Sequence, residues 1–411
     1  MVKIAKTGDQ KFLQALNRTL VLNTIHQFKT ISRIEIAKKT RLSQSTVSNV
    51  IDALEKEGYI AEVGTGNSTR AGGRRPTILT INPAGGYMAT VVVVTEAFHL
   101  TLQICLFDLH LTMVDEQEIE VKEKGSELIE SIKSHVRDFL DKHADKNVIG
   151  LGFSMPTVLD RNGVVYRGHL LELEDYPFEE EMRKAFPSMF LVVEQEQHAA
   201  ILGERALGPA KEVNNLIYVT VGRGIGSSVI VNNELIRGEY GGAGEIGHMS
   251  INKYGPKCIC GKKGCLRLYA TELAFISKIT EAVGNGIPVS PKIYNPVLDK
   301  CNIREVYNQA VAGDEFCREM LVSMLDDLAI GLSNLIYLIN PKMIIIGGNL
   351  LFAESFVLPY IKDKLKEIVD SPTADIQIIG AVLGNKSSVH GIASLILDKH
   401  FLKKELMFHI A

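Results

Sequence analysis

Three cysteines and one histidine lie close together near the middle of this 411-residue chain. His248 is followed by Cys258, Cys260 and Cys265, a spacing of H-x9-C-x-C-x4-C, with glycines in between that allow the chain to turn back on itself. Zn²⁺ binds thiolate and imidazole, and three thiolates with one imidazole complete a tetrahedron that leaves no position for water. The pattern therefore predicts a structural zinc site rather than a catalytic one. The alternative is a chance clustering of cysteines in a loop.

The other cysteines and the apolar pattern indicate the compartment. Cys105, Cys301 and Cys317 are isolated, so the six cysteines do not form a disulfide framework, and a reducing cytoplasm is expected. No uninterrupted apolar run reaches the roughly 18 residues that a membrane span needs, and the N-terminus lacks the pattern of a secretory signal. We therefore expect a cytoplasmic protein without a membrane partner.

Charge is distributed unevenly along the chain. Residues 1–75 carry 13 lysines and arginines against 6 acidic residues, a balance of +7, and the remainder carries 32 against 42, a balance of −10. A basic segment ahead of an acidic body suggests a small nucleic-acid-binding module. On charge alone, a merely solvated basic surface is the simpler interpretation.

The order of elements in the basic segment favours the nucleic-acid-binding module over a solvated surface. Apolar residues recur at helical spacing over 16–28, and Ser32 with Glu35 three residues later has the pattern of a capping box at the start of a second helix. After a short turn, Ser43 is placed to cap a third helix that extends to about Gly58. Helix, short turn and helix at these lengths are typical of a helix-turn-helix.

The third helix and the segment after it carry side chains suited to DNA. The candidates on the helix are short hydroxyl and amide side chains that can reach phosphates and base edges, namely Ser43, Gln44, Ser45, Thr46, Ser48 and Asn49. For each of them, an ordinary capped polar face is the alternative. Two strand-like segments, 59–63 and 77–81, flank a glycine-rich hairpin that predicts a wing. Its arginines suit phosphate or minor-groove contact, namely Arg70, Arg74 and Arg75.

A different organisation begins after residue 82. Strand-like apolar runs such as 87–94 and 216–221 alternate with helical stretches such as 126–142, which predicts an α/β body in two lobes. A glycine turn over 220–226 follows one strand and can bring backbone N–H groups close to an anion. A simple β-hairpin explains the same pattern.

These motifs together resemble the ROK family, which contains transcriptional repressors and sugar kinases. The resemblance rests on GGRRP in the wing and on TVGRGIG, GEIGHM and CxCGxxGC in the body, and it covers nearly the whole chain. The stretch YGPKCICGKKGC and the LYA that follows are most similar to the xylose repressors of that family. The resemblance also implies that the zinc ligands are His248, Cys258, Cys260 and Cys265.

The resemblance implies a fold and domain boundaries. A winged helix-turn-helix domain is expected at 1–82, followed by a two-lobed, actin-like ATPase fold of the sugar-kinase type. The first lobe is expected at 83–200, completed by a C-terminal helix around 387–402, and the second lobe with the zinc loop at 201–386. A ligand cleft is expected between the lobes.

Two departures from the family's kinases argue against an enzyme. Where the kinases have a glycine-containing phosphate loop, this chain reads Thr95-Glu96-Ala97-Phe98-His99, without a glycine for close backbone approach to a phosphate. Where they have a catalytic aspartate, this chain has Glu196. Its extra methylene moves the carboxylate by roughly an ångström, a displacement that can cost about 100-fold in a positioned site.

The expected sugar contacts are also altered. By the resemblance, the ligand-binding positions are occupied by Gln195, Glu196, Glu245, His248 and Arg267. Arg267 stands where the family has a glutamate, and a guanidinium donates hydrogen bonds and prefers anions. Either the ligand carries a carboxylate or phosphate that meets Arg267, or Arg267 pairs internally with Glu196, or Arg267 points to solvent.

The sequence therefore predicts a DNA-binding repressor of a carbohydrate-utilisation operon. A homodimer or a dimer of dimers is expected to bind operator DNA and to be released by a sugar or sugar-derivative inducer. Two other functions stay open at this point. One is a sugar kinase with an appended DNA-binding domain, and the other is a repressor controlled by a protein partner.

Overall fold

The computed structural model describes residues 10–65, 76–95, 100–168, 170–295, 300–370 and 376–402. The chain divides into two compact units. The first comprises Met1–Met155, Gly168–Glu194 and Ile392–Ala411, and the second comprises Pro156–Arg167 and Gln195–Gly391. Some predicted features lie outside the described residues, namely Arg70, Arg74 and Arg75 of the wing and residues 96–99 of the segment in the phosphate-loop position.

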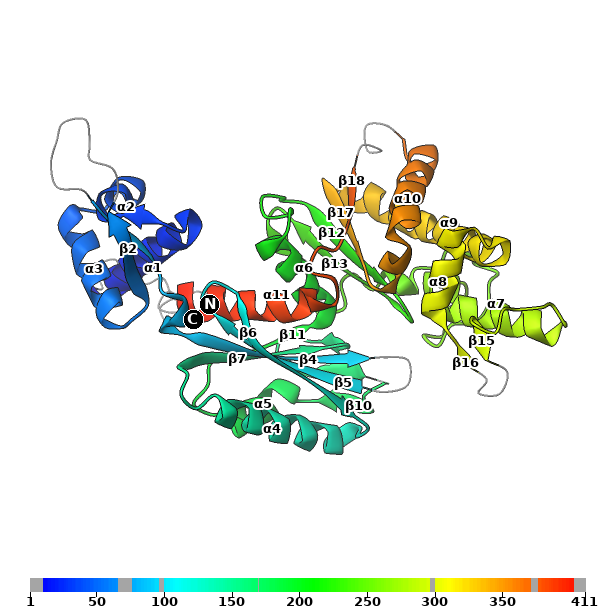
Figure 1. The fold of residues 1–411 in the computed structure, drawn as a ribbon, viewed down its shortest axis with the longest axis horizontal. Helices are drawn as coiled ribbons and strands as arrows, with labels where there is room; N and C mark the ends of the chain where they lie inside the picture. Colours follow the sequence, from blue (N-terminus) through cyan, green and yellow to red (C-terminus); the bar gives the residue numbers. More distant parts are fainter. Residues whose placement is uncertain are drawn as a thin grey trace. The chain divides into compact units, whose positions relative to one another are not determined.

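The first unit begins with three helices and a small antiparallel sheet of order β1-β3-β2 (Figure 1). The elements are α1 (Gln10–Phe28), β1 (Ile31–Ser32), α2 (Arg33–Thr40), α3 (Gln44–Lys56), β2 (Ile60–Thr65) and β3 (Thr77–Ile81). Of the apolar positions predicted from the helical period, Val21, Ile25, Ile51 and Leu54 are completely buried and form the core. Leu20 and Phe28, which were predicted on the same face of α1, are exposed, because they lie outside the face that α1 buries. The predicted helix-turn-helix and its two flanking strands are confirmed.

Side-chain caps determine where the second and third helices begin. The Glu35 N–H donates to Ser32 Oγ at 3.3 Å and the Ser32 N–H donates to the Glu35 carboxylate at 3.0 Å, so the predicted capping box is present. Ser43 Oγ accepts from the Thr46 N–H at 3.0 Å. These caps satisfy N–H groups that would otherwise lack a partner, and they set which residues α3 exposes.

A five-stranded mixed sheet of order β11-β7-β4-β5-β6 follows the winged helix. Its strands are β4 (Tyr87–Thr95), β5 (Leu100–Asp108), β6 (Met113–Val121), β7 (Val148–Met155) and β11 (Leu191–Gln195). The helices α4 (Gly125–Lys142) and α5 (Phe178–Ala185) lie on one face, where Phe153 of β7 meets Phe178 of α5 at 5.5 Å between ring centroids (Figure 1).

The opposite face of this sheet receives α11 (Ser387–Ile396). A Cβ on Gly150 would lie 2.5 Å from Ile396 Cγ2, and a Cβ on Gly152 would lie 2.2 Å from Ile392 Cγ2. The two glycines of β7 therefore leave the space that the isoleucines of α11 occupy. Alternation along the strand places Phe153 on the other face, towards α5.

The second unit is built on another five-stranded sheet, of order β14-β13-β12-β17-β18. Its strands are β12 (Leu216–Val221), β13 (Ile225–Val231), β14 (Glu234–Leu235), β17 (Met343–Gly347) and β18 (Gln377–Gly380). The helices of this unit are α6 (Glu196–Leu207), α7 (Glu272–Gly284), α8 (Ile303–Ala312), α9 (Glu315–Ile339) and α10 (Glu354–Ile368). Side chains of β12 and β17 share one hydrophobic core with α7 to α10. The predicted α/β class is confirmed.

Short elements complete the described chain. The strands are β8 (Val158–Leu159), β9 (Val165–Gly168), β10 (Leu173–Tyr176), β15 (Tyr294–Asn295) and β16 (Lys300–Cys301). The helical turns are η1 (Pro83–Gly85), η2 (Ile246–His248), η3 (Leu266–Leu268), η4 (Asn349–Ala353), η5 (Gly384–Lys386) and η6 (Leu397–Leu402). The last of these is a π-helix.

One described helix, α9, is long and apolar enough to cross a membrane by length and composition alone. Half of its apolar window is buried within the structure. Residues such as Leu321, Leu325, Leu328 and Leu332 are completely buried in the core of the second unit. A core helix of this kind passes the same test of length and composition, so the helix is weak grounds for a membrane span.

Candidate metal centre and ligand site

The four predicted metal ligands lie in the loop between β14 and α7. The loop is closed by two isolated antiparallel bridges, Ser250↔Cys265 and Lys257↔Lys263. Gly264 has φ +65°, and a Cβ there would lie 1.7 Å from the Asn252 carbonyl oxygen. Only glycine fits this close approach, which brings the two ends of the loop together.

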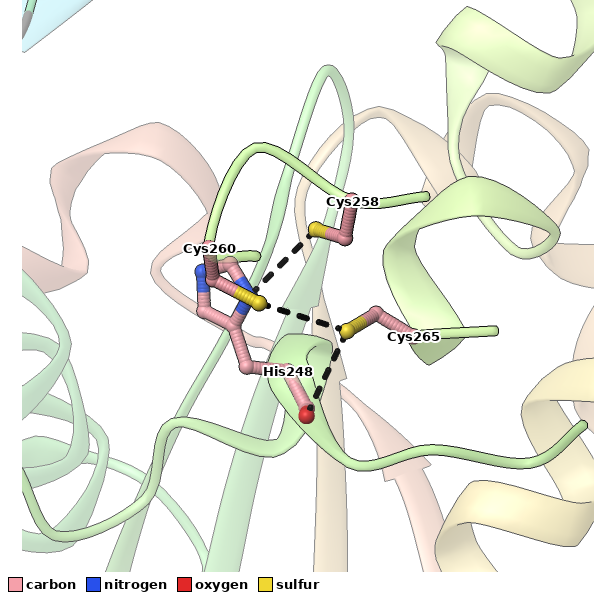
Figure 2. Close-up of side chains that lie close together, drawn as sticks. All are labelled: His248, Cys258, Cys260 and Cys265. Atoms are coloured by element: carbon pink, nitrogen blue, oxygen red, sulfur yellow. Dashed lines mark hydrogen bonds between the residues drawn. The ribbon is translucent and has the colours of Figure 1, made fainter. Parts of the chain in front are cut away.

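The side chains of His248, Cys258, Cys260 and Cys265 converge (Figure 2). His248 Nδ1 lies 3.7 Å from Cys258 Sγ, and Cys260 Sγ lies 3.5 Å from Cys265 Sγ. All four candidate ligand atoms lie within 4.8 Å of one another. A tetrahedral Zn²⁺ with Zn–S bonds of about 2.3 Å separates its ligand atoms by about 3.8 Å. The cluster therefore has the donor types and the spacing that a tetrahedral metal ion requires.

Burial and crowding shift the pKa values within the cluster. Burial and the two neighbouring thiols raise the pKa of Cys265 to about 12, because thiolates packed together repel one another. A bound cation reverses this effect and stabilises the thiolates. Burial, assisted by the charges of Arg267 and Lys262, lowers the pKa of His248 and favours the neutral imidazole that coordinates metals.

The predicted ligand-binding residues all belong to the second unit. Gln195 and Glu196 lie at the start of α6, Glu245 and His248 at η2, and Arg267 on η3. Gln195 Nε2 donates to Glu245 Oε1 at 3.4 Å. The fold therefore brings residues together that are 50 positions apart in sequence.

Arg267 acts on Glu245 and His248 in this arrangement. Its positive charge helps to lower the pKa of His248. The pKa of Glu245 is raised by desolvation, which is the larger influence, and the charge of Arg267 partly opposes that rise. Among the described residues, no ion pair joins Arg267 to Glu196. The internal pairing of Arg267 with Glu196 that the sequence left open is therefore absent from this structure.

Glu196 occupies the first residue of α6, and burial raises the pKa of its carboxyl group to about 7. Its neighbours Gln197 and His198 are additional residues that the sequence analysis did not select. Gln197 Oε1 accepts from the Thr220 hydroxyl at 2.8 Å, and a Cβ on Gly226 would lie 2.6 Å from the Gln197 side chain. Gln197 therefore joins α6 to β12 and β13. Gly226, whose lack of a side chain leaves space for Gln197, was the sequence signal for this contact.

The glycine turn between β12 and β13 is a β-hairpin. The Gly222 N–H donates to the Gly224 carbonyl at 3.0 Å, and the Glu272 N–H donates to the Gly222 carbonyl at 2.9 Å. Arg223 at its tip lies near the buried Glu272. Burial raises the pKa of Glu272, and Asn349 and Arg223 partly oppose that rise. Asn349 Nδ2 donates to Glu272 Oε1 at 2.8 Å. Of the two interpretations of this turn, an anion-binding loop and a simple β-hairpin, the β-hairpin explains these contacts.

The candidate DNA-binding residues of α3 are described, and those of the wing are not. Gln44, Ser45 and Asn49 are exposed, whereas Thr46 and Ser48 are half-buried. The Ser43 hydroxyl lies 2.9 Å from the Ser45 hydroxyl and 2.8 Å from the Thr46 hydroxyl, in addition to its role as a cap. The exposed polar side chains therefore line the N-terminal turn and one face of α3.

Comparison with known proteins assigns both parts of the chain. Residues 100–399 match the ROK family and residues 16–62 match the MarR family. The chain is 31% identical to the xylose repressor of Caldicellulosiruptor bescii, over 88% of this chain and 89% of that protein. It is 29% identical to the xylose repressor of Bacillus subtilis strain 168, over 96% and 98% of the two chains.

Solved structures show the same fold. A ROK family transcriptional regulator, a homologue of the E. coli MLC protein, superposes with a TM-score of 0.82 at 21% identity, covering 97% of this chain and 99% of that one. A ROK family glucokinase from Streptomyces griseus superposes with a TM-score of 0.64 at 20% identity, covering 75% and 98%. With the family match over most of its length, the chain belongs to the ROK family.

Proposed function

We propose that this protein is a DNA-binding transcriptional repressor of a carbohydrate-utilisation operon that responds to a sugar. The observation that carries the proposal is the union of a capped helix-turn-helix with a ROK body in one chain. Relatives named xylose repressor align along 88% and 96% of that chain, so they share both parts. The winged helix is proposed to occupy 1–82, with the body in lobes at 83–200, completed by 387–402, and at 201–386.

The DNA contacts are proposed to come from α3 and the wing. A homodimer or a dimer of dimers would place two copies of α3 in successive major grooves of a palindromic operator. The exposed Gln44, Ser45 and Asn49 would reach base edges or phosphates, with Ser43, Thr46 and Ser48 beside them. Arg70, Arg74 and Arg75 would contact the neighbouring phosphates or the minor groove.

The metal is proposed to be Zn²⁺ in a structural role. The four-ligand cluster fits a tetrahedral ion, and His248, Cys258, Cys260 and Cys265 would supply all four ligands. Zinc held in this way keeps η2 and η3 close together. It therefore supports the positions of Glu245 and Arg267 in the candidate ligand site.

The inducer is proposed to be a sugar or a sugar derivative that binds at Gln195, Glu196, Glu245, His248 and Arg267. Carboxylate and amide side chains bind sugar hydroxyls through hydrogen bonds. Arg267 adds a positive charge that interacts electrostatically with Glu245. The names of the relatives support D-xylose as the first ligand to test. Arg267 supports acidic or phosphorylated derivatives as the second group.

An enzyme is a weaker proposal than a repressor. Burial raises the pKa of Glu196 to about 7, which suits a general base, and the fold is shared with ROK family kinases. Against this stand Glu196 in the place of an aspartate and the absence of a glycine in the sequence Thr95-Glu96-Ala97-Phe98-His99.

The protein is proposed to be cytoplasmic. Its six cysteines do not form a disulfide framework, which supports a reducing compartment.

The proposal is tested by operator selection and release. A duplex is selected from random sequences by the purified full-length protein, and fluorescence anisotropy then measures its affinity. D-xylose, D-xylonate and glucose 6-phosphate are added in turn. We expect a palindromic duplex that one of these compounds releases. A protein that selects no sequence is not a repressor, and release only by a protein from the same cell would favour the partner-controlled alternative.

A further inference from the structure

Helices α6 and α11 make backbone contact inside the second unit. A Cβ on Gly391 would lie 1.7 Å from the Ala199 carbonyl oxygen, and a Cβ on Gly203 would lie 2.1 Å from the Ser387 carbonyl oxygen. The backbones of the two helices therefore meet with no side chain between them. Packing this close leaves little space for one helix to shift independently of the other.

Polar contacts join the first turn of α11, and the residue Leu383 before it, to two positions on α6. Ser388 Oγ donates to the backbone carbonyl of Glu196 at 3.2 Å. Glu204 of α6 is completely buried, and its carboxylate accepts from the Leu383 N–H at 2.9 Å and from Ser387 Oγ at 2.7 Å. The first residue of α6, which belongs to the candidate ligand site, is thus tied directly to the first turn of α11.

Helix α11 passes from one compact unit to the other between Gly391 and Ile392. In the first unit, Ile392 and Ile396 occupy the space above the glycines of β7. The helix then changes its hydrogen-bond register and continues as the π-helix Leu397–Leu402. π-helices are rare, are mostly single turns, and are frequent at functional sites.

The π-helix ends on the winged helix. Phe401 packs edge-on against Tyr59, with ring centroids 4.9 Å apart and an interplanar angle of 70°. Tyr59 lies between α3 and β2, and Arg18 of α1 stacks over its ring while binding Glu57 at 2.6 Å. A cavity of about 130 Å³ adjoins this contact, lined by Arg18, Glu57 and Tyr59 on one side and by His400 and Phe401 on the other.

A π-helix and an α-helix point the same residue in different directions. The α-helix closes i→i+4 hydrogen bonds at 3.6 residues per turn, and the π-helix closes i→i+5 bonds. Converting the π turn to α geometry displaces the following side chains by about one residue, or roughly 100° around the helix axis. Such a change removes Phe401 from Tyr59, and the adjoining cavity leaves space for the ring to move. An α-helical arrangement of this segment would therefore differ from the observed π-helix by a discrete step rather than by a small shift.

We propose that α11 and its π-helical end form a latch that couples the candidate ligand site to the winged helix. In the latched arrangement, Phe401 on Tyr59 holds the winged helix ready for DNA. Displacement of α6 at Glu196 moves α11, changes the register of the π-helix and releases Tyr59. The latch rests on the proposed repressor function and adds to it the element that carries the signal.

A double-mutant cycle with the selected duplex tests the latch without any need for an inducer. Phe401→Leu keeps an apolar side chain and removes the ring contact, and Ser388→Ala removes the hydrogen bond to Glu196. Each change is expected to weaken duplex binding by about threefold or more. Because both act on one latch, the double variant is expected to bind no more weakly than Phe401→Leu alone. Additive effects, or unchanged affinity in both single variants, would overturn the latch.

Matched variants separate the latch from general damage. Ser333→Ala on α9 also removes a buried serine hydrogen bond to a backbone carbonyl, from Ser333 Oγ to Ile330 at 2.8 Å, and is expected to leave affinity unchanged. Tyr59→Phe keeps the ring and is expected to bind like the wild type.

Amide hydrogen exchange in residues 397–402 provides a second measurement that holds even where Phe401→Leu folds poorly. Ser388→Ala is expected to speed exchange there by about threefold, and unchanged exchange contradicts the latch. Wild-type protein that binds no selected duplex overturns the repressor function and the latch together. Wild-type binding with additive variants overturns the latch alone.

Discussion

Glu196 begins α6, and its carboxyl group is only partly accessible to solvent. Burial raises its pKa from 4.5 to about 7. The folded protein therefore binds this proton more tightly than the unfolded chain does. As the pH rises from about 4.5 to about 7, the unfolded state gains relative to the folded one, and stability falls across that window. Above about pH 7 the loss is complete.

Glu196→Gln is expected to remove this loss of stability. At pH 8 the variant should be more stable than the wild type by up to about 3 kcal/mol, and at pH 4.5 the difference should be small. Urea unfolding of both proteins across pH 4.5 to 8 measures the effect. Glu120→Gln, at an exposed position on β6, serves as the control and should show no such window. Parallel pH profiles for Glu196→Gln and the wild type would show that Glu196 is not desolvated.

The residues of the candidate site could be selected from the sequence, but the contacts that they make in the fold could not. Cysteine and histidine spacing alone indicated the cluster at His248, because metal ligands close in sequence need only a turn to converge. The contact between Gln195 and Glu245 depends on how α6 packs beside η2, and it has no local signal. Arg267 was left with three possible surroundings, and only the folded loop showed its influence on Glu245 and His248.

At the scale of elements, the capping box of α2 makes a measurable contribution to the stability of that helix. The Ser32 hydroxyl and the Ser32 N–H both donate to the Glu35 carboxylate, at 2.7 Å and 3.0 Å, and these two bonds lower the pKa of Glu35. Ser32→Ala removes one acceptor and is expected to cost about 1 kcal/mol. Amide hydrogens of α2 should then exchange about fivefold faster in the full-length protein. Ser32→Thr keeps the hydroxyl and should exchange like the wild type, and equal rates in both variants would contradict the role of the cap.

The metal loop is the second element with a testable role. We expect the purified protein to hold about one zinc ion per chain, measured by elemental analysis. Chelation should lower the melting temperature, because the loop between β14 and α7 has little regular structure to hold it together. Cys258→Ser should lower both the zinc content and the melting temperature, and Cys301→Ser, outside the cluster, should change neither. Zinc-free protein with an unchanged melting temperature would contradict a structural role.

Element prediction was most direct where local signals, such as helical spacing and side-chain caps, mark an element. The helices of the winged helix followed from helical spacing and two caps, since both signals are local. The edge strand β6 is largely polar and has no clear apolar alternation to mark it in the sequence. The π-helix has no sequence pattern of its own. Its Phe401 and His400 contact the rings of Tyr59 and Phe190, which lie far away in sequence.

At the scale of the whole molecule, one fold serves both repressors and kinases, so the fold alone does not decide the activity. The decision rests on a few positions in this chain. Glu196 carries a carboxyl group on a longer side chain than aspartate, and the segment after β4 has no glycine for phosphate binding. Positioned carboxylates and phosphates tolerate displacements of only a fraction of an ångström. These two sequence features therefore favour the proposed sugar-responsive repressor over a phosphoryl-transfer enzyme.

We accordingly expect no phosphorylation of D-xylose or D-glucose by ATP. A coupled ADP-release assay with the purified protein should give the same rate as Glu196→Gln, with a ROK family glucokinase as the positive control. Under the same conditions D-xylose should still raise the melting temperature if it is the inducer, because a ligand that binds only the folded state stabilises it by mass action. Sugar-dependent ADP release that disappears in Glu196→Gln would instead identify Glu196 as a working base and make the protein a kinase with a DNA-binding domain.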